Sequence, residues 1–424
     1  MMKILDAARL ADAEVLNRRI EDYTEYEPVV RGIISRVREE GDAALRDFAE
    51  KFDGGAPASL ELSAEERRAA LARVSDEYKA MLERAAANIR EFHEKQVRQG
   101  FSYTRPDGTV LGQKFTPVQR AGIYVPGGTA SYPSTVLMNA IPAKVAGVGE
   151  IIMATPPARG GKVRDEIVAA AEIAGVDRIF LIGGAGAIAA LAFGTESVPR
   201  VDKITGPGNI YVALAKKEVF GTVGIDMVAG PSEILVIADD SADAPTVAAD
   251  LLSQAEHDRL ASAVLVTTDR TLAENVAAET ERQLALLPRE EIARASVENC
   301  GKIIVADSID EAVRISNAIA PEHLELCVKD PFALLDKITA AGSIFLGHNT
   351  PEAAGDYFAG PNHTLPTGGS ARFSSPLSVD DFVKKSSFIC YSKDAFENAI
   401  DDIVMFAESE GLSAHARSAE ARRK

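Results

Sequence analysis

The sequence predicts an α/β protein built from parallel strands that are covered by helices. From about residue 120, short apolar segments of strand length alternate with Ala-rich segments of helix length, which is the pattern of repeated βαβ units. The strands are too many for one compact sheet of ordinary size, so we expect two βα layers with a seam near residues 228–235. Residues 1–100 instead repeat apolar positions at helical spacing and are expected to be helical.

The expected strands follow one another at 123–125, 150–155, 178–184, 202–205, 233–239, 263–269, 302–307 and 343–347. Helical segments separate them, among them 134–148, which contains a proline, and 246–256. Segment 355–376 is rich in Gly, Pro, Asn and Ser and is long for a loop, and loops of this kind in compact enzymes usually carry function. Residues 377–424 are expected to form a small appendage that ends in a helix.

Composition and charge exclude several classes of function. The chain has 46 Lys and Arg against 63 Asp and Glu, a net charge of −17, which argues against a nucleic-acid or anionic-membrane partner. No apolar stretch approaches the roughly 20 residues of a transmembrane helix, and acidic residues interrupt the N-terminus where a signal peptide needs an apolar core. Cys300, Cys327 and Cys390 form no CxxC pair and are expected to pack as small buried residues. We therefore expect a cytoplasmic protein whose metal would be held by nitrogen and oxygen atoms.

A helix end carries the first candidate metal ligands. In SQAEHD (253–258), Gln254 and His257 are three residues apart, so their side chains share a helix face. A Gln carbonyl and an imidazole can both bind a divalent metal. The alternative is a polar helix end at which His257 caps the last carbonyls.

An acid and a base are adjacent in APEHLEL (320–326). Glu322 and His323 can address two different atoms of one substrate, as two proton transfers require. The alternative is a helix N-terminus, where the helix dipole favours Glu322. A further histidine, His93, lies in the charged segment EFHEKQ and is expected at the surface.

Two later segments add carboxylates and imidazoles. Asp356 and His363 are seven residues apart in the long loop, and Glu410 and His415 lie on either side of a glycine near the C-terminus. Together with the Gln and His of segment 253–258, they supply a nitrogen and oxygen set that suits zinc with an open position for a substrate.

Glycine-rich turns follow three of the expected strands. Segment 184–189, Gly-x-Gly-x-x-Ala, resembles a dinucleotide-binding fingerprint, with Asp202 at about the distance expected of a ribose partner. Small residues here also let a helix pack closely on a sheet, so both interpretations stay open. The turns VPGGT (125–129) and TGPGN (205–209) lie at strand ends, where open α/β sheets bind ligands.

Taken together, these segments resemble histidinol dehydrogenase over nearly the whole chain. The resemblance runs from GDAALRDFAEKFDGG (41–55) to EGLSAHA (410–416). Between them lie GIYVPGG, STVLMNAIPAKVAG, TGPGN, IDMVAGPSEILVIAD, LLSQAEHD, APEHLEL and AGDYFAGPNHTLPTGGSARFSSPLSVDDF, in the order of the family. These motifs are long and distinctive.

The resemblance implies a zinc-dependent, NAD-linked enzyme that oxidises L-histidinol through L-histidinal to L-histidine, in the last steps of histidine biosynthesis. It also implies a homodimer with one zinc per subunit. The implied zinc ligands are Gln254, His257 and Asp356 of one chain, with His415 supplied by the C-terminal segment of the partner.

The remaining implied roles follow residue by residue. Glu322 and His323 match the catalytic pair, and Tyr124 and Asn209 match NAD contacts. The positions that match substrate contacts are Ser232, Gln254, His257, His323, Asp356, Glu410 and His415. One position departs from the family, which usually has Gln in a GGAQA turn that contacts NAD. This chain has Gly186 there, so we expect one cofactor contact to be lost and discount the fingerprint interpretation.

The predicted domains are an N-terminal helical segment, two Rossmann-like domains and a C-terminal segment. The helical segment is 1–25, and the first Rossmann-like domain is 26–127 plus 236–376, with most of the zinc site. The second is 128–235, with the NAD contacts, and the C-terminal segment 377–424 is expected to reach the active site of the partner.

Three other functions compete with this interpretation. A related zinc- and NAD-dependent dehydrogenase could act on another small alcohol. A zinc hydrolase using Glu322 on water would leave the turns 125–129 and 205–209 without a role, and a non-catalytic zinc protein would leave the Glu–His pair idle.

Overall fold

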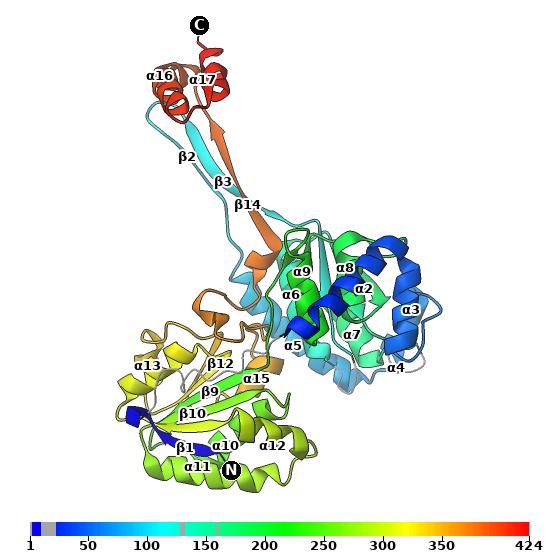
Figure 1. Cartoon of the computed structure of the whole chain (residues 1–424), viewed down its shortest axis with the longest axis vertical. Coiled ribbons are helices and arrows are strands. Elements are labelled where there is room, and N and C mark those ends of the chain that lie inside the picture. The colour runs from blue at the N-terminus through cyan, green and yellow to red at the C-terminus, as the bar shows by residue number, and fades with distance from the viewer. Residues whose placement is uncertain (1, 10–22, 128–131, 158–160, 424) are drawn as a thin grey trace. The chain divides into compact units, whose positions relative to one another are not determined.

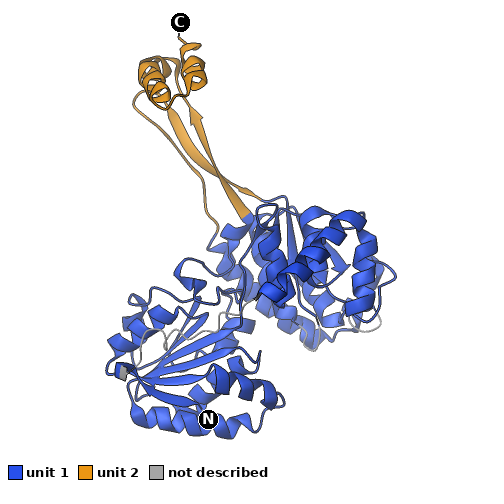
Figure 2. Ribbon diagram, in the orientation of Figure 1, with its two compact units in different colours: residues 1–96, 118–382 blue, residues 97–117, 383–424 orange. Residues whose placement is uncertain are grey.

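The computed structural model describes residues 2–9, 23–127, 132–157 and 161–423. Two compact units divide the chain: unit 1 comprises residues 1–96 and 118–382, and unit 2 comprises residues 97–117 and 383–424 (Figure 2). The predicted α/β class with two parallel sheets is confirmed. Within the part of the chain described, no helix is long and apolar enough to cross a membrane.

The five-stranded sheet of unit 1 has the strand order of a doubly wound fold, β6-β5-β4-β7-β8. These parallel strands are β4 (Arg120–Tyr124), β5 (Glu150–Thr155), β6 (Arg178–Leu181), β7 (Lys203–Thr205) and β8 (Gly224–Ile225). The connecting helices are α6 (Pro133–Ala146), α7 (Asp165–Ala174), α8 (Gly184–Phe193) and α9 (Ile210–Val219). Because the direction of winding reverses between β4 and β7, a ligand crevice is expected at the carboxyl ends of these two strands.

Helices from the first hundred residues cover both faces of the five-stranded sheet, which accounts for their apolar periodicity. On one face α4 (Ala64–Arg73) and α5 (Asp76–Glu94) share an apolar core with α6 and α7. On the other face α2 (Glu27–Glu40) and α3 (Asp42–Phe52) share a core with α8 and α9. Helices α6 and α8 are therefore buried nearly all round, as their apolar sequences require.

The six-stranded sheet of unit 1 is also parallel, with the order β1-β11-β10-β9-β12-β13. Its strands are β1 (Lys3–Asp6), β9 (Glu233–Ala238), β10 (Ser262–Thr267), β11 (Lys302–Val305), β12 (His323–Cys327) and β13 (Ser343–Leu346). Helices α10 (Ala244–Ala255), α11 (Arg270–Leu284) and α12 (Glu290–Asn299) cover one face, and α13 (Ile309–Ile319) covers the other (Figure 1). Two short helices follow, α14 (Phe332–Leu335) and α15 (Glu352–Tyr357).

Two strands of this sheet correct the sequence interpretation. β1 falls in the segment 1–25 that was expected to be helical, and it pairs with β11 from the far end of the sequence, with Lys3 opposite Lys302. Residues 1 and 10–22 of that segment lie outside the described residues. β12 begins where a helix N-terminus was considered for Glu322. Every residue of β12 is buried, because the strand lies between β9 and β13.

Unit 2 is an antiparallel ribbon that ends in two helices. β3 (Val110–Pro117) pairs with β2 (Phe101–Thr104) on one side and with β14 (Val383–Cys390) on the other. The helices α16 (Lys393–Ser409) and α17 (Ser413–Glu420) follow β14. The ribbon thus joins residues 97–117 to the expected C-terminal appendage, a pairing that the sequence does not predict. Met405 and Phe406 of α16 are each 69% exposed.

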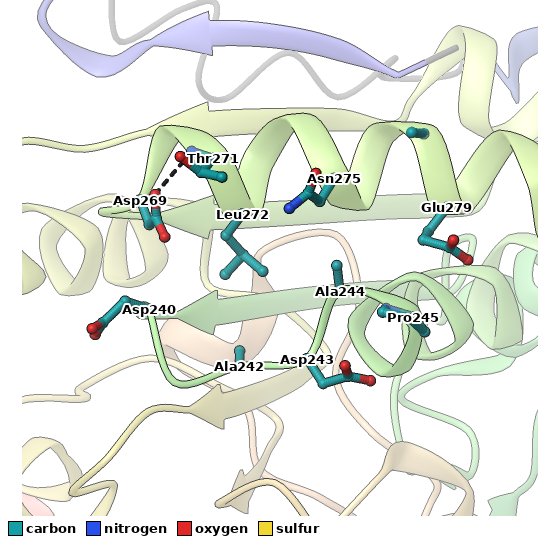
Figure 3. A pocket seen from close by; sticks show the side chains of 11 residues that line it. Asp240, Ala242, Asp243, Ala244, Pro245, Asp269, Thr271, Leu272, Asn275 and Glu279 are labelled. Carbon is teal, nitrogen blue, oxygen red and sulfur yellow. Dashed lines mark hydrogen bonds between the residues drawn. The ribbon is translucent and has the colours of Figure 1, made fainter.

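A hollow of about 450 Å³ lies at the carboxyl ends of β9 and β10 (Figure 3). Asp243 and Asp269 border it and cap α10 and α11, and the Asp269 carboxylate accepts a hydrogen bond from the backbone N–H of Thr271 at 2.8 Å. Asp240 and Glu279 add two more carboxylates to its rim. This hollow therefore repels anions.

A buried ion pair supports the turn that follows β7. Lys216 of α9 and Asp226 are paired, and their side chains are 2% and 1% exposed. The Lys216 ammonium donates to the carbonyl oxygen of Gly206 at 2.9 Å, and the Gly206 N–H donates to Asp226 at 2.8 Å. Gly206 has a φ of +116°, and a Cβ there would meet the carbonyl oxygen of Tyr124 at 2.1 Å. Only glycine fits this turn, and the ion pair binds both of its backbone polar groups.

We expect Lys216→Met to lower the free energy of unfolding by about 3–5 kcal/mol, because Asp226 would be left buried without its counter-charge. Urea unfolding followed by circular dichroism measures this change. Lys217→Met is the matched control, because the Lys217 side chain is 57% exposed and its pair with Glu27 should contribute only about 0–1 kcal/mol. Equal losses in the two variants would contradict the assigned role of the buried pair.

Candidate functional site

The crevice expected from the strand order is present in unit 1, with a volume of about 340 Å³. One wall consists of residues that follow β4 and β7, including Gly127 and the turn at 206–209. The other wall consists of residues at the amino ends of β9 and β12, the end of α10, and α15 with the long loop after it. The crevice therefore collects most of the motifs that the sequence singled out.

Gln254 and His257 lie at the end of α10, as the pattern predicts. Gln254 is 1% exposed, whereas His257 is exposed in the single chain. The Gln254 amide nitrogen lies 3.2 Å from Nδ1 of His323. Its carbonyl oxygen Oε1 is buried and has no hydrogen-bond partner among the described residues. The end of α10 thus offers an unpaired oxygen and an imidazole to the same crevice.

Glu322 and His323 lie at the start of β12. Nδ1 of His323 is 3.0 Å from the carbonyl oxygen of Glu233, and a carbonyl can only accept. Nδ1 therefore donates and Nε2 is the basic nitrogen, so the Gln254 amide nitrogen, which also only donates, touches Nδ1 without a hydrogen bond. Nε2 lies 3.6 Å from the Asp356 carboxylate. The Glu322 carboxylate accepts from the backbone N–H of Glu233 at 2.9 Å, so one residue of β9 orients both members of the pair.

Helix α15 places two carboxylates in the crevice. Glu352 and Asp356 are four residues apart and therefore share a helix face. The backbone N–H of Glu352 donates to the carboxylate of Glu325 on β12 at 2.8 Å, which fixes the start of the helix. His257, Glu352 and Asp356 each offer one ligand atom, and these atoms lie within 4.8 Å of one another.

The electrostatics of the cluster are unusual because several acids are buried together. Burial raises the pKa of Glu322 to about 8, although His323 opposes the change. Burial would lower the pKa of His323, but the carboxylates of Glu352 and Glu322 outweigh burial and raise it to about 10. Burial also raises the pKa of Glu352 to about 7. A cation among these carboxylates would lower the pKa of each group, since positive charge favours the deprotonated forms.

The donor atoms fit a divalent metal ion. Gln254 Oε1, His323 Nε2 and Glu352 Oε2 are buried without hydrogen-bond partners among the described residues, and all three side chains line the crevice. A buried polar atom without a partner costs about 1–3 kcal/mol, so such atoms indicate that another group is bound here in function. Oxygen and imidazole donors suit zinc.

A second acidic pair lies behind the crevice. Asp250 of α10 and Glu325 of β12 are hydrogen-bonded, and burial together with the charge of Asp250 raises the pKa of Glu325 to about 9. Two carboxylates in hydrogen-bond contact share a proton, and the pair connects α10, β12 and the start of α15. Cys327, next along β12, is buried as expected, whereas Cys300 is half-buried and Cys390 is exposed, contrary to expectation.

The two residues that match NAD contacts lie on the five-stranded sheet. Asn209 lines the crevice and caps α9, where its side-chain oxygen accepts from the backbone N–H groups of Tyr211 and Val212. Tyr124 ends β4 and is 3% exposed, and its hydroxyl accepts from the backbone N–H of Gly184 at 3.0 Å. Of the turn VPGGT (125–129), residues 128 and 129 lie outside the described residues.

The fingerprint interpretation of segment 184–189 is wrong. The segment opens α8 after the edge strand β6, away from the reversal of winding between β4 and β7. Asp202 lies at the opposite, amino end of the strands, where its carboxylate accepts from the backbone N–H groups of Gln119 and Arg120. A Cβ at Gly186 would point at α3, 3.4 Å from Phe48. Close helix packing explains these small residues.

The other residues that match substrate contacts divide between the two units. Ser232 borders the crevice. His363, from the long loop, also lines it, and Nδ1 of His363 lies 3.0 Å from the backbone oxygen of Asp356. Glu410 and His415 belong to unit 2, at the turn between α16 and α17, and both are exposed.

Sequence reasoning missed two residues that build the site. His93 was expected at the surface but is fully buried. Its Nδ1 lies 2.7 Å from the Ile89 carbonyl oxygen, and its Nε2 lies 3.4 Å from the side-chain nitrogen of Asn362 in the long loop. Glu352 was not considered. Its spacing of four residues from Asp356 was the available signal, but Asp356 was assigned to the loop 355–376 and not to a helix.

Comparison with known proteins agrees with this geometry. The family profile described as histidinol dehydrogenase matches residues 16–423. Histidinol dehydrogenase of Geobacter sulfurreducens is 58% identical over 97% of this chain and 96% of its own length, and that of Geobacter metallireducens is 59% identical over 97% and 95%. The crystal structure of histidinol dehydrogenase from Elizabethkingia anophelis superposes with a TM-score of 0.94 at 39% identity, covering 99% of this chain and 98% of that one. The chain therefore belongs to the histidinol dehydrogenase family.

Proposed function

We propose that this chain catalyses the NAD-linked oxidation of L-histidinol through L-histidinal to L-histidine. The observation that carries the proposal is the crevice in which Glu322 and His323 meet a set of metal-binding donors beside the turn after β7. Family membership supports the substrate and the place of the reaction in histidine biosynthesis.

The first oxidation requires a base for the alcohol proton. Nε2 of His323 accepts this proton while the carbinol carbon gives a hydride to NAD⁺, so that histidinal and NADH form. The carbonyl of Glu233 holds the Nδ1 proton and orients the ring for this transfer. The imidazolium then releases its proton to solvent before the second oxidation.

The second oxidation requires a water molecule. Glu322 takes a proton from water as the water oxygen bonds to the aldehyde carbon, and then gives this proton to the former carbonyl oxygen, which produces the hydrate. The hydrate gives a hydride to a second NAD⁺ and a hydroxyl proton to His323, and histidine results. Burial of Glu322 keeps its pKa near neutrality, where a carboxyl group exchanges protons most effectively.

The proposed zinc ligands are Gln254, His257 and Asp356, together with His415 of the partner subunit. When bound, zinc would position the imidazole and amino nitrogen of the substrate and stabilise negative charge nearby. The unpaired oxygen of Gln254 and the spacing of His257 and Asp356 support this assignment. Ser232 and Glu410 are proposed to contact the substrate.

We assign NAD to the five-stranded sheet rather than to the six-stranded sheet. The reversal of winding between β4 and β7 opens into the crevice, with Asn209 in its wall. Tyr124 ends β4 but is not among the described residues that line the crevice. The equivalent end of the six-stranded sheet is lined by Asp240, Asp243 and Asp269, which would repel a pyrophosphate.

A homodimer with shared sites is proposed for two reasons. Glu410 and His415 belong to unit 2, whereas the other proposed ligands belong to unit 1. Unit 2 also exposes large apolar side chains, including Ile389, Met405 and Phe406, and exposed apolar patches mark protein contacts. The second candidate function is a related dehydrogenase of another small alcohol, which the same donors could bind.

The purified protein is expected to hold about one zinc per chain and to form two NADH per L-histidinol consumed. Absorbance of NADH and metal analysis measure both quantities, and a chelator should stop the reaction until zinc is restored. Activity that survives complete removal of metal would refute the zinc assignment. NADH formation with other small alcohols but not with histidinol would favour the second candidate.

Glu322→Gln is expected to slow oxidation of histidinal more than oxidation of histidinol, because only the second half-reaction uses water. His323→Asn should slow both halves by about 10²–10⁴-fold, as loss of a general base does. Rapid-mixing measurements of NADH, started from either substrate, separate the halves. Glu256→Gln is the matched control, because Glu256 follows α10 but is not among the described residues that line the crevice. Equal losses in both halves for Glu322→Gln would show that Glu322 is structural.

Co-refolding His257→Ala chains with His415→Ala chains should restore activity if sites are shared between subunits. In a mixed dimer one site carries both lesions and the other carries neither, and random pairing makes about half of the dimers mixed. Activity should therefore approach about a quarter of the wild-type value, whereas each variant alone stays inactive. Mixed dimers without recovered activity would place His415 in the site of its own chain.

A further inference from the structure

Glu352 is a buried carboxylate in the crevice to which the sequence pattern assigns no role. The residue is 3% exposed, and its oxygen Oε2 has no hydrogen-bond partner among the described residues. A carboxylate in this position is costly, because burial disfavours its charge and Asp356 and Glu322 repel it. The position of Glu352 in the first turn of α15 does not explain its burial. An acid can interact favourably with the helix dipole while it is exposed to solvent.

The position of Glu352 relates it to the proposed metal ligands. It lies one helical turn before Asp356 on the same face of α15, and one of its oxygens is within 4.8 Å of ligand atoms of His257 and Asp356. Two ligands on a tetrahedral zinc lie about 3.4 Å apart, given metal–ligand distances of about 2.1 Å. Small side-chain rotations would bring these atoms onto one ion.

The two helices therefore supply two pairs of donors. Helix α10 and the residues just after it carry Gln254 and His257, three residues apart, and α15 carries Glu352 and Asp356, four residues apart. Both pairs obey the spacing that places side chains on one helix face. One chain thus offers four nitrogen and oxygen donors, the number that a closed tetrahedral zinc site requires.

We propose that Glu352 is a fourth zinc ligand within each chain, which holds the metal before His415 of the partner subunit reaches it. This rests on the proposed function, because it takes zinc to be the resident metal. Imidazole from the partner then replaces the carboxylate when the dimer forms. The metal site is in this way complete at each stage of assembly, and zinc binding does not depend on dimer formation.

The test is zinc affinity, measured with zinc alone by competition against a chromophoric chelator. Four proteins are compared: wild type, His415→Ala, His415→Ala/Glu352→Gln and the matched control His415→Ala/Glu256→Gln. Gln preserves the size of the side chain but replaces an anionic oxygen donor by a neutral amide oxygen, which binds zinc more weakly than a carboxylate does. The zinc-induced rise in melting temperature gives a second readout that does not depend on activity.

His415→Ala is expected to retain about one zinc per chain with reduced affinity. Addition of Glu352→Gln should weaken binding by a further tenfold or more, because a direct ligand should contribute at least as much as the about 10–100-fold effect of groups that only orient ligands, whereas Glu256→Gln should not. Restoration of binding by His415→Ala/Glu352→His would confirm a ligand role, since a histidine restores a donor and not a packing contact.

Equal zinc affinity of His415→Ala and its Glu352→Gln derivative would overturn the proposal. Unchanged affinity with a raised KM for histidinol in Glu352→Gln would also overturn it and assign Glu352 to the ammonium group of the substrate. A wild-type chain that binds no zinc would instead refute the proposed function, so the two failures are distinguishable.

Discussion

Buried Glu322 and Glu352 and half-buried Asp356 lie around the imidazole of His323, and the repulsion among their charges constrains how the rest of the site is built. Burial and neighbouring acids raise the pKa of Glu322 and Glu352, while three imidazoles, of His323, His363 and His257, lower the pKa of Asp356 against the effect of its burial. A divalent cation among these side chains would relieve this repulsion and lower the pKa of His323, because positive charge favours the deprotonated forms.

The polarity of the two sheets brings that cluster to the proposed cofactor site. Parallel sheets usually bind ligands at the carboxyl ends of their strands, and the five-stranded sheet opens these ends into the crevice. The six-stranded sheet offers its amino ends, where Glu322 and His323 begin β12. The winding of the six-stranded sheet reverses between β9 and β12. At the carboxyl ends of these two strands, the Asp239 carboxylate accepts from the backbone N–H of Lys329 at 3.1 Å and so links the segments that follow them.

Buried polar pairs outside the crevice fix the positions of the elements that carry the reactive side chains. The hydrogen-bonded pair Asp250–Glu325 connects α10 to β12, and Glu325 also accepts from the first N–H of α15. His93 on α5 and Asn362 perform a similar task for the long loop. Such pairs keep donor positions accurate to a fraction of an ångström, which metal and hydride chemistry both need.

By itself the sequence determined the elements and the residue types of the chemistry. The α/β alternation, the end of α10 with Gln254 and His257, and the adjacent Glu322 and His323 are local patterns, and local patterns persist in the fold because helix and strand periods are set by the backbone. The tertiary structure alone decided which distant segments meet. Strand β1 pairs with β11, the ribbon of unit 2 unites 97–117 with 383–390, and Glu352 reaches His257 only because α15 packs beside α10. His93 and Asp202 were not predictable for the same reason. The burial of His93, and the location of Asp202 at the amino end of the sheet, depend on neighbours that lie far away in the chain.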